Sequence, residues 1–422
     1  MDLKGKKILI LGSTELIAGI VRKCKELGVY TIVTDNRPLH KAPAKLIADK
    51  YYDIDFSDIE EISRMIQKEK VNGVLTGFTD SYMKFYVDIC KANGLPCYMD
   101  YHQLEIATDK TAFKSACIKS GVPVIPGDTA EKYEDAVEIA NVTGYPVMLK
   151  PVDNSGSRGV IKCEDEGGLK NAYEYALSFS ESKRVIVEKY LACSSMAVSY
   201  FLADGNIRLS TTDDRMIHKD KESGSSISCY SEYPSKYTLR YIDEVNDKVV
   251  RMLQDNGFKN GMVSLQTFVD ESSFYFCEMC YRPSGGQHYT LVHRFNDVDQ
   301  LALLIEFAVT GNCVSNWEME KETPFFSEKC AQLRILGKPG KRIMKLAGFE
   351  QLKSQPNVIK SFSVLNPGNI IGRSGTTAQV IGNVVYTFTH EEDRQAVANS
   401  IFSNLDISDG AGENVAWFTL GD

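Results

Sequence analysis

The sequence lacks the features that assign a chain to several common classes of protein. Its 422 residues contain no low-complexity tract, and the net charge of −8 gives no electrostatic reason to expect nucleic acid or an anionic membrane as partner. The apolar run "KKILIL" is too short for a signal peptide, and "VDQLALLIEFAVTG" is too short to span a bilayer. The eleven cysteines lack the dense spacing of a secreted disulfide scaffold. We therefore expect a cytoplasmic protein of about two or three domains.

A complete dinucleotide-binding fingerprint is also missing. The first hundred residues alternate strand and helix signals, which predicts a parallel sheet with crossover helices. Ligands of such sheets bind beyond the carboxyl ends of the strands, where Gly12, Asp35 and the segment 77–80 would lie. Asp35 follows Gly12 at roughly the spacing of a ribose-binding acid, but the second and third glycines of G-x-G-x-x-G are absent. Ordinary polar residues at strand ends are therefore the favoured interpretation.

Beyond residue 105 the patterns predict a mixture of helices and antiparallel strands. Residues 107–121 read as a helix with Thr108 as candidate N-cap, and residues 196–211 as a hairpin turning at Asp204 and Gly205. The polar stretch 213–235 shows no periodicity and predicts a long surface loop, a common form of functional lid. The tail predicts strands at 330–336, 358–365 and 377–388 and a closing helix at 391–405.

Cys277 and Cys280 have the C-x-x-C spacing of a half zinc site, but no second pair accompanies them. They lie in a run that reads as the second strand of a hairpin. Residues three apart in a strand point to opposite faces, so the two sulfurs would not reach one metal. We do not expect zinc here.

The same hairpin places an amide and a carboxylate opposite one another. With "DESS" as its turn, Gln266 and Glu278 are nearly paired, and Phe276, Glu278 and Cys280 are expected to share a face. One oxygen ligand from each strand suits Mg²⁺, which takes few protein oxygens and fills the rest of its shell with phosphate and water. An exposed polar pair on a sheet surface is the plain alternative.

Cations and small residues at other positions favour phosphate binding. Lys150 emerges at the end of an apolar strand, and the loop Ser155–Gly159 offers backbone N–H groups to phosphate oxygens. Lys110 lies near a helix start, and Arg282 follows Glu278 with a planar fork suited to a phosphoryl group. Each feature alone also fits a solvated charge or a glycine turn, but their order along the chain favours a shared phosphate site.

With these motifs in order, the sequence resembles the ATP-grasp superfamily, with likeness to amino-acid ligase-like, biotin carboxylase-like and purine-pathway members. The resemblance implies an α/β and α+β multidomain fold. It implies a parallel-sheet pre-grasp domain over residues 1–105, two ATP-grasp lobes over 106–315 with a hinge near 188–191, and a small strand-rich α+β domain over 316–422.

The resemblance also assigns roles to residues at matching positions. It implies that two lysines and a glycine-rich lid hold the ATP phosphates, that the hinge recognises the adenine end, that two oxygen ligands hold the metal, and that Lys150 and an arginine are catalytic. The matching residues are Lys110 and Lys150; Ser155, Gly156, Ser157 and Gly159; Glu188, Lys189 and Leu191; Gln266 and Glu278; and Arg282. Candidate substrate contacts are Thr79, Asp80, Ser284, Gly285 and Gly286.

Three positions depart from the family pattern. Cys280 stands where the family has asparagine, and a thiol is a poor ligand for a hard cation. Gln266 stands where many members have glutamate, and Met196 lies near a position that is commonly glutamate. These departures leave open whether one or two metals bind.

The activity that the resemblance implies is ligation of a small-molecule carboxylate to an amine through an acyl phosphate, with ATP and Mg²⁺, or Mn²⁺ in its place. A phosphoribosylglycinamide synthetase-like or carbamoyl-phosphate-like enzyme is the close variant, and a nucleotide-binding regulator without ligase activity is the alternative of another class. Neither a biotin-carrier motif nor a glutamine-amidotransferase stretch appears. A homodimer is compatible with the family.

Overall fold

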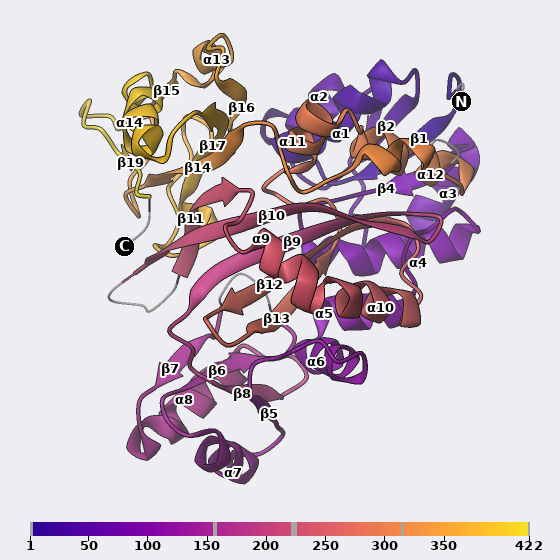
Figure 1. Cartoon of the computed structure of the whole chain (residues 1–422). Coiled ribbons are helices and arrows are strands. Elements are labelled where there is room, and N and C mark those ends of the chain that lie inside the picture. The colour runs from indigo at the N-terminus through magenta and orange to yellow at the C-terminus, as the bar shows by residue number, and fades with distance from the viewer. Residues whose placement is uncertain (1–2, 155–157, 221–225, 314–315, 421–422) are drawn as a thin grey trace.

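The computed structural model describes residues 3–154, 158–220, 226–313 and 316–420 (Figure 1). Three regions follow one another along the chain: an N-terminal α/β domain, a small lobe at the bottom of Figure 1, and a body built on one long sheet. Each has a hydrophobic core, and the core of the N-terminal domain is continuous with that of the body. Among the described residues, none of the helices has the length and apolar character needed to cross a membrane.

The N-terminal domain is the parallel sheet that the alternating pattern predicts. Its strands lie in the order β3-β2-β1-β4 and pair in parallel. The strands are β1 (Lys7–Leu11), β2 (Tyr30–Thr34), β3 (Lys50–Tyr52) and β4 (Gly73–Leu75), and the helices are α1 (Glu15–Glu26), α2 (Pro43–Ile47), α3 (Ile59–Glu69) and α4 (Met83–Asn93). Asp35 accepts a hydrogen bond from Ser13 at 2.7 Å, which is ordinary polar bonding between strand ends.

The predicted helix over 107–121 is two helices, α5 (Tyr101–Thr108) and α6 (Lys110–Lys119). Thr108 is therefore not an N-cap but the last residue of α5. Asp109 caps α6 instead, because its carboxylate accepts the N–H groups of Thr111 and Ala112. The small lobe follows as an antiparallel sheet in the order β5-β8-β6-β7 with two helices. Its elements are β5 (Gly127–Ala130), α7 (Tyr133–Thr143), β6 (Val147–Pro151), β7 (Ile161–Cys163), α8 (Glu166–Ser178) and β8 (Val185–Lys189).

The body is a nine-stranded sheet in the order β13-β12-β9-β10-β11-β14-β17-β16, with β19 also paired to β14. Its strands are β9 (Ser194–Ala203), β10 (Asn206–Lys219), β11 (Ser226–Tyr233), β12 (Gly261–Val269), β13 (Phe274–Tyr281), β14 (Lys329–Gly337), β16 (Val358–Ser363), β17 (Val380–Phe388) and β19 (Ala416–Trp417). The predicted surface loop over 213–235 is wrong for most of its length, because β10 runs to Lys219 and β11 begins at Ser226. Its polar side chains are paired with one another, as when Asp214 accepts from Ser235 at 2.7 Å, so the strands need no apolar alternation.

Helices cover this sheet and join it to the N-terminal domain. They are α9 (Thr238–Tyr241), η3 (Ile242–Asn246), α10 (Asp247–Asp255), α11 (Tyr289–Asn296) and α12 (Gln300–Thr310). The β4 strand packs on α12 so closely that a Cβ on Gly73 would lie 1.7 Å from the carbonyl oxygen of Ala308. Because α12 is enclosed in this way, Leu303 and Phe307 are buried as well as Leu301, Leu304, Ile305 and Ala308.

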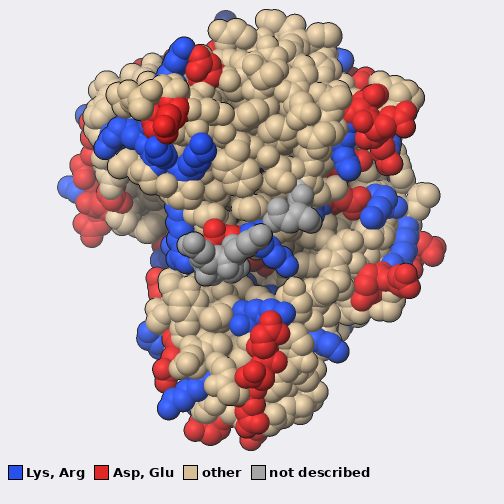
Figure 2. All heavy atoms as spheres, turned by 90° about the vertical axis from the view of Figure 1, so that its left-hand side faces the viewer, with Lys and Arg blue, Asp and Glu red and all other residues tan. Residues whose placement is uncertain are grey.

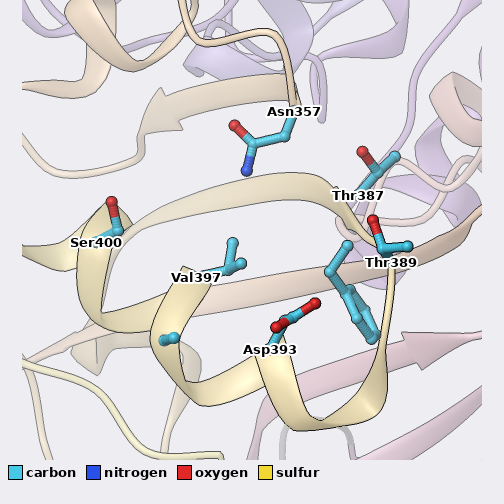
Figure 3. A pocket seen from close by; sticks show the side chains of 8 residues that line it. Asn357, Thr387, Thr389, Asp393, Val397 and Ser400 are labelled. Carbon is cyan, nitrogen blue, oxygen red and sulfur yellow. The ribbon is translucent and has the colours of Figure 1, made fainter.

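The tail adds strands to the body sheet and builds its own core beside it. That core unites tail residues with Ile227 and Tyr230 of β11. The remaining elements are β15 (Lys345–Ala347), α13 (Phe349–Leu352), α14 (Arg394–Ser403) and β18 (Asp406–Ser408), together with the short η4 (Asn316–Lys321) before β14. A hollow of about 390 Å³ between β17 and α14 is lined by small polar and apolar side chains and by none of the predicted site residues (Figure 3).

Candidate active site

Gln266 and Glu278 lie directly opposite each other in the register of β12 and β13, as predicted. A β-bulge follows, because Thr267 pairs with Phe276 and Cys277 is the extra residue. The bulge reverses the alternation, so Phe276 is buried on the other face and does not share a face with Glu278 as expected. Both oxygen-bearing side chains remain on the partly exposed face, where a cation can reach them.

The two cysteines of the C-x-x-C motif have separate surroundings. The Cys277 thiol donates to the carbonyl of Gln266 at 3.4 Å, whereas the sulfur of Cys280 accepts from Arg282 at 3.6 Å. Burial raises the pKa of both thiols to about 12, so both stay protonated at neutral pH. Across the described residues, no three His, Cys, Asp or Glu side chains gather as metal ligands. This arrangement suits a cation that takes most of its ligands from phosphate and water.

Lys150 faces this hairpin from the small lobe, at the end of β6. Its Nζ lies 2.8 Å from Oε2 of Glu188, and Lys114 on α6 reaches Oε1 of the same carboxylate at 3.1 Å. Burial opposes the charge of Lys150, but Glu188, with help from the nearby Glu278, raises its pKa above the ordinary value. The two glutamates and the lysine therefore share one electrostatic environment. Lys114 is not among the residues predicted from the sequence. Its position one helical turn after Lys110, on the same face of α6, is the signal that could have identified it.

The predicted hinge residues have structural partners of their own. The side chain of Glu188 is 3% exposed and is held by its two lysines, so it is not free to contact an adenine. The N–H of Lys189 donates to the carbonyl of Pro126 at 2.9 Å. Leu191 follows β8 in the connection to β9, which joins the small lobe to the body.

Lys110, at the start of α6, directs its Nζ to the carbonyl of Asn154 at 2.7 Å. This bond brings it to the loop predicted as the lid, of which Ser155, Gly156 and Ser157 lie outside the described residues. Gly159 has φ +75°, and a Cβ there would lie 2.7 Å from the side chain of Phe179. The glycine is therefore required by packing as well as by backbone conformation.

Arg282 is buried at the end of β13 and forms a two-point ion pair with Asp80. Its Nε lies 2.6 Å from Oδ1 and its Nη2 lies 2.7 Å from Oδ2. The same loop docks through the N–H of Phe78, which donates to the carbonyl of Pro283 at 3.0 Å. The structure thus joins two predicted residues, one expected to bind phosphate and one expected to contact substrate. Thr79 lies in the same loop, half-buried.

The turn Ser284–Gly286 lies where the N-terminal domain, the body and the tail meet. A Cβ on Gly285 would contact Leu16 of α1 at 4.0 Å, and one on Gly286 would lie 3.2 Å from the amide oxygen of Gln332 in β14. The N–H of Gly286 donates to the Ser284 hydroxyl at 3.2 Å. This N–H is therefore engaged within the turn.

A second cationic group, which sequence analysis missed, lies on β10 and β14. Arg215 donates through Nε to Asp213 at 3.0 Å, and burial, followed by the charge of the nearby Arg215, lowers the pKa of Arg334. His288 is buried beside them, and burial together with Arg215 lowers its pKa to about 4. The signal in the sequence is the placement of Asp213 and Arg215 two residues apart, which puts an acid and a base on one face of a strand. The prediction of a loop over 213–235 hid this relationship.

Met196 is fully buried in β9 and pairs with Thr267, on the face opposite to Gln266. Its position therefore removes no ligand from the open face. Figure 2 shows Lys and Arg side chains gathered in the notch between the small lobe and the body. The pair Gln266 and Glu278 and the side chain of Lys150 are near neighbours across the boundary between the body and the small lobe.

Comparison with known proteins finds relatives with an ATP-binding domain. Residues 109–285 match the family described as carbamoyl-phosphate synthase L chain, ATP binding domain. The formate-dependent phosphoribosylglycinamide formyltransferase of Bacillus velezensis is 24% identical over 363 residues, covering 80% of this chain and 90% of the relative. The carbamoyl phosphate synthase large chain of Clostridium acetobutylicum is 23% identical over 322 residues, covering 73% of this chain and 29% of the relative.

Solved structures show the same fold over nearly the whole chain. The biotin carboxylase domain of 2-oxoglutarate carboxylase from Hydrogenobacter thermophilus, solved with MgADP and bicarbonate, superposes with a TM-score of 0.80 at 20% identity, covering 96% of this chain and 91% of its own. An L-amino acid ligase from Bacillus licheniformis gives 0.78 at 15% identity, covering 96% and 99%. The fold, together with the family match, defines an enzyme with an ATP-binding domain. Residues 109–285 form an ATP-binding domain of the ATP-grasp superfamily, and the whole chain has the fold of proteins that contain this domain.

Proposed function

We propose that this protein is an ATP-dependent ligase that joins a carboxylate to an amine through an acyl-phosphate intermediate. The observation that carries the proposal is the Gln266–Glu278 pair on the open face of the hairpin, with Lys150 facing it from the small lobe. Phosphoryl transfer requires positioning and charge neutralisation more than covalent catalysis, and this cleft supplies both.

The chain's own residues have distinct roles in this reaction. Lys110 and Lys150 neutralise the ATP phosphates, and Glu188 keeps Lys150 charged. Glu278 and Gln266 are the residues that would hold Mg²⁺, or Mn²⁺ in its place; when bound, the ion neutralises charge on the β- and γ-phosphates. We propose the backbone at Lys189 and Leu191 for the adenine end and the loop around Gly159 for the lid.

In the first step an oxygen of the substrate carboxylate attacks the γ-phosphorus of ATP, so that a P–O bond forms and ADP departs. In the second step the amine attacks the acyl carbon, inorganic phosphate departs, and the amine loses a proton. Arg282, held by Asp80, stabilises the negative charge that develops on the transferred group. Thr79 and the turn Ser284–Gly286 border this position as candidate substrate contacts.

Two alternatives rest on specific observations. Relatives include a phosphoribosylglycinamide formyltransferase and a carbamoyl phosphate synthase chain, so a purine-pathway or carbamoyl-phosphate-like reaction is the close variant. Cys280, a protonated thiol beside the metal pair, motivates a nucleotide-binding regulator without turnover.

A phosphate-release screen of the full chain over carboxylates and amines, with mass spectrometry of products, tests the proposal. Release of ADP and phosphate that requires both a carboxylate and an amine supports the ligase. Tight MgATP binding with no turnover in any mixture would instead identify the regulator.

We also propose that the protein acts as a homodimer in the cytoplasm. The structural neighbour from Hydrogenobacter thermophilus was solved as a dimer, and all eleven cysteines of this chain are free thiols, which suits a reducing compartment. Sedimentation of the full chain tests the first statement, and a monomer at micromolar concentration would contradict it.

A further inference from the structure

The body sheet runs without a break from the hairpin β12–β13 to the strands of the tail (Figure 1), and polar side chains lie along one of its faces. Residues that pair across neighbouring strands point to the same face. From β13 to β10 the paired residues are Glu278, Gln266, Ala197 and Asp213. Two residues beyond Asp213, Arg215 faces the same way, and its register continues through Ser231 to Gln332 of β14. Arg334 is two residues beyond Gln332 on this face.

The two arginines on this face share a single carboxylate. Arg215 donates to Asp213, which is 2% exposed. Arg334 donates to the carbonyl of Ser228, and in the part of the chain that the structure describes it forms no ion pair. Burial, and then the charge of Arg215, lower the pKa of Arg334. Two half-buried cations therefore face one anion.

The other groups at this place do not balance the excess charge. Arg282 is already paired with Asp80. His288 is neutral at pH 7, and burial raises the pKa of Tyr233 well above its ordinary value, so its phenol is neutral as well. The two arginine forks at this place therefore have one carboxylate between them, and each remains partly open to solvent.

We propose that Arg215 and Arg334 together bind an anionic group, a carboxylate or a phosphate, on a substrate of the ligase, at a point separate from the carboxylate that is phosphorylated. Three strand spacings separate the backbone at Glu278 from that at Asp213, roughly 14 Å. Side chains from both ends shorten this gap, so the substrate has its second anionic group several bonds from the reacting centre. The inference rests on the proposed function, because it concerns a substrate of that reaction.

The test measures anion binding with the nucleotide site already filled. The thermal unfolding midpoint of the full chain is recorded with saturating MgADP, against increasing inorganic phosphate or glutarate at constant ionic strength, for the wild type, Arg334→Gln, Arg334→Lys and the control Arg64→Gln. Arg64 is exposed on α3, far along the chain from this face. The two anions separate phosphate from carboxylate specificity.

We expect at least one of the two anions to raise the unfolding midpoint of the wild type and of the control by the same amount. Arg334→Gln should require at least about ten-fold more of that anion for the same rise. Arg334→Lys keeps the charge but not the fork, and should fall between them. A wild type that responds to neither anion more than Arg334→Gln does would overturn the inference. Failure of MgADP to raise the midpoint would contradict the proposed function instead, so the two outcomes are distinguishable.

A purely structural role for Arg334 predicts a different result. If Arg334 served only to stabilise the fold through its hydrogen bond to the carbonyl of Ser228, Arg334→Met would lower the unfolding midpoint in anion-free buffer. If the arginine is retained to bind an anion, the apolar replacement removes its repulsion with Arg215 and leaves the midpoint unchanged or raised. A large drop for Arg334→Met would count against the inference.

Discussion

Asp80 and Arg282 lie 202 residues apart in the chain and meet through two parallel hydrogen bonds of 2.6 and 2.7 Å. The pair fixes the loop after β4 against the end of the hairpin β12–β13. Because Asp80 presents no chemistry of its own beyond this fork, we interpret it as a positioning residue for Arg282.

Replacement Asp80→Asn keeps the shape of the side chain and removes its charge. We expect a loss of roughly 3 kcal/mol in unfolding free energy, because Arg282 is left buried without its counter-ion. We also expect kcat to fall more than the KM for MgATP rises, since Arg282 acts on the transferred group. Asp88→Asn is the matched control, an α4 carboxylate paired with Lys84 at the surface, which should change stability by less than about 1 kcal/mol. Equal effects of the two variants on kcat would contradict the positioning role.

Replacement Glu278→Gln removes one negative charge from the metal pair and leaves its shape. Phosphate release should fall by about 100-fold or more, because the metal loses its anionic ligand. Stability should change by less than about 1 kcal/mol, since the side chain is only half-buried. Glu271→Gln in the exposed turn of the same hairpin is the control. If the Glu278 variant retains wild-type turnover, the metal assignment is wrong.

Glu188 is the shared counter-ion of Lys114 and Lys150. Glu188→Gln leaves Lys114 and Lys150 buried without an anion, so urea unfolding should show a loss of roughly 3–5 kcal/mol. The surface pair of Glu164 with Lys162 provides the comparison, where Glu164→Gln should cost less than about 1 kcal/mol. A Glu188 variant as stable as the Glu164 variant would show that the lysines find other partners.

His288 predicts a defined pH dependence of stability. Burial, with Arg215 nearby, lowers its pKa to about 4, against about 6.5 in an unfolded chain. The depressed pKa means that the unfolded chain binds the proton first as pH falls. Stability from this residue is therefore complete above about pH 6.5 and declines to about pH 4, by up to roughly 3 kcal/mol. His288→Gln should flatten the urea-unfolding profile between these values, and an unchanged profile would place the titration elsewhere.

Gly73 tests the contact between the N-terminal sheet and α12. A Cβ would lie 1.7 Å from a helix carbonyl, so Gly73→Ala should lower the thermal midpoint strongly, by an amount equivalent to roughly 3 kcal/mol or more. Gly19→Ala is the control, because nothing lies within 4 Å of a Cβ there. A mild effect of Gly73→Ala would mean that β4 and α12 separate easily.

The local motifs were predictable because their physics is local. Alternation along two strands and a short turn sufficed to oppose Gln266 and Glu278, and strand–helix alternation sufficed for the parallel sheet. The bulge at Cys277 was not predictable, because a single extra residue leaves no mark on composition. It reversed the face assigned to Phe276.

Polar contacts between residues far apart in the chain could not be predicted from the sequence for a similar reason. Residues 213–219 lack an apolar stripe, since their partners are side chains on strands more than a hundred residues away or on a nearby turn. Arg215 was therefore assigned to a loop, and Arg334 to an ordinary strand. The ion pair between Arg282 and Asp80 likewise depends on how two domains pack together, and no local sequence pattern determines that packing.

Strand β11 pairs directly with β14, so the strands before residue 235 and the strands of the tail form one continuous sheet. During synthesis, β11 therefore emerges nearly a hundred residues before the strand that covers its edge, and Arg215 before the arginine that completes its pair. A chain that ends before β14 has an unpaired edge at β11 and lacks one of the two arginines of the anion site. We therefore expect truncated products to aggregate rather than to bind substrate weakly.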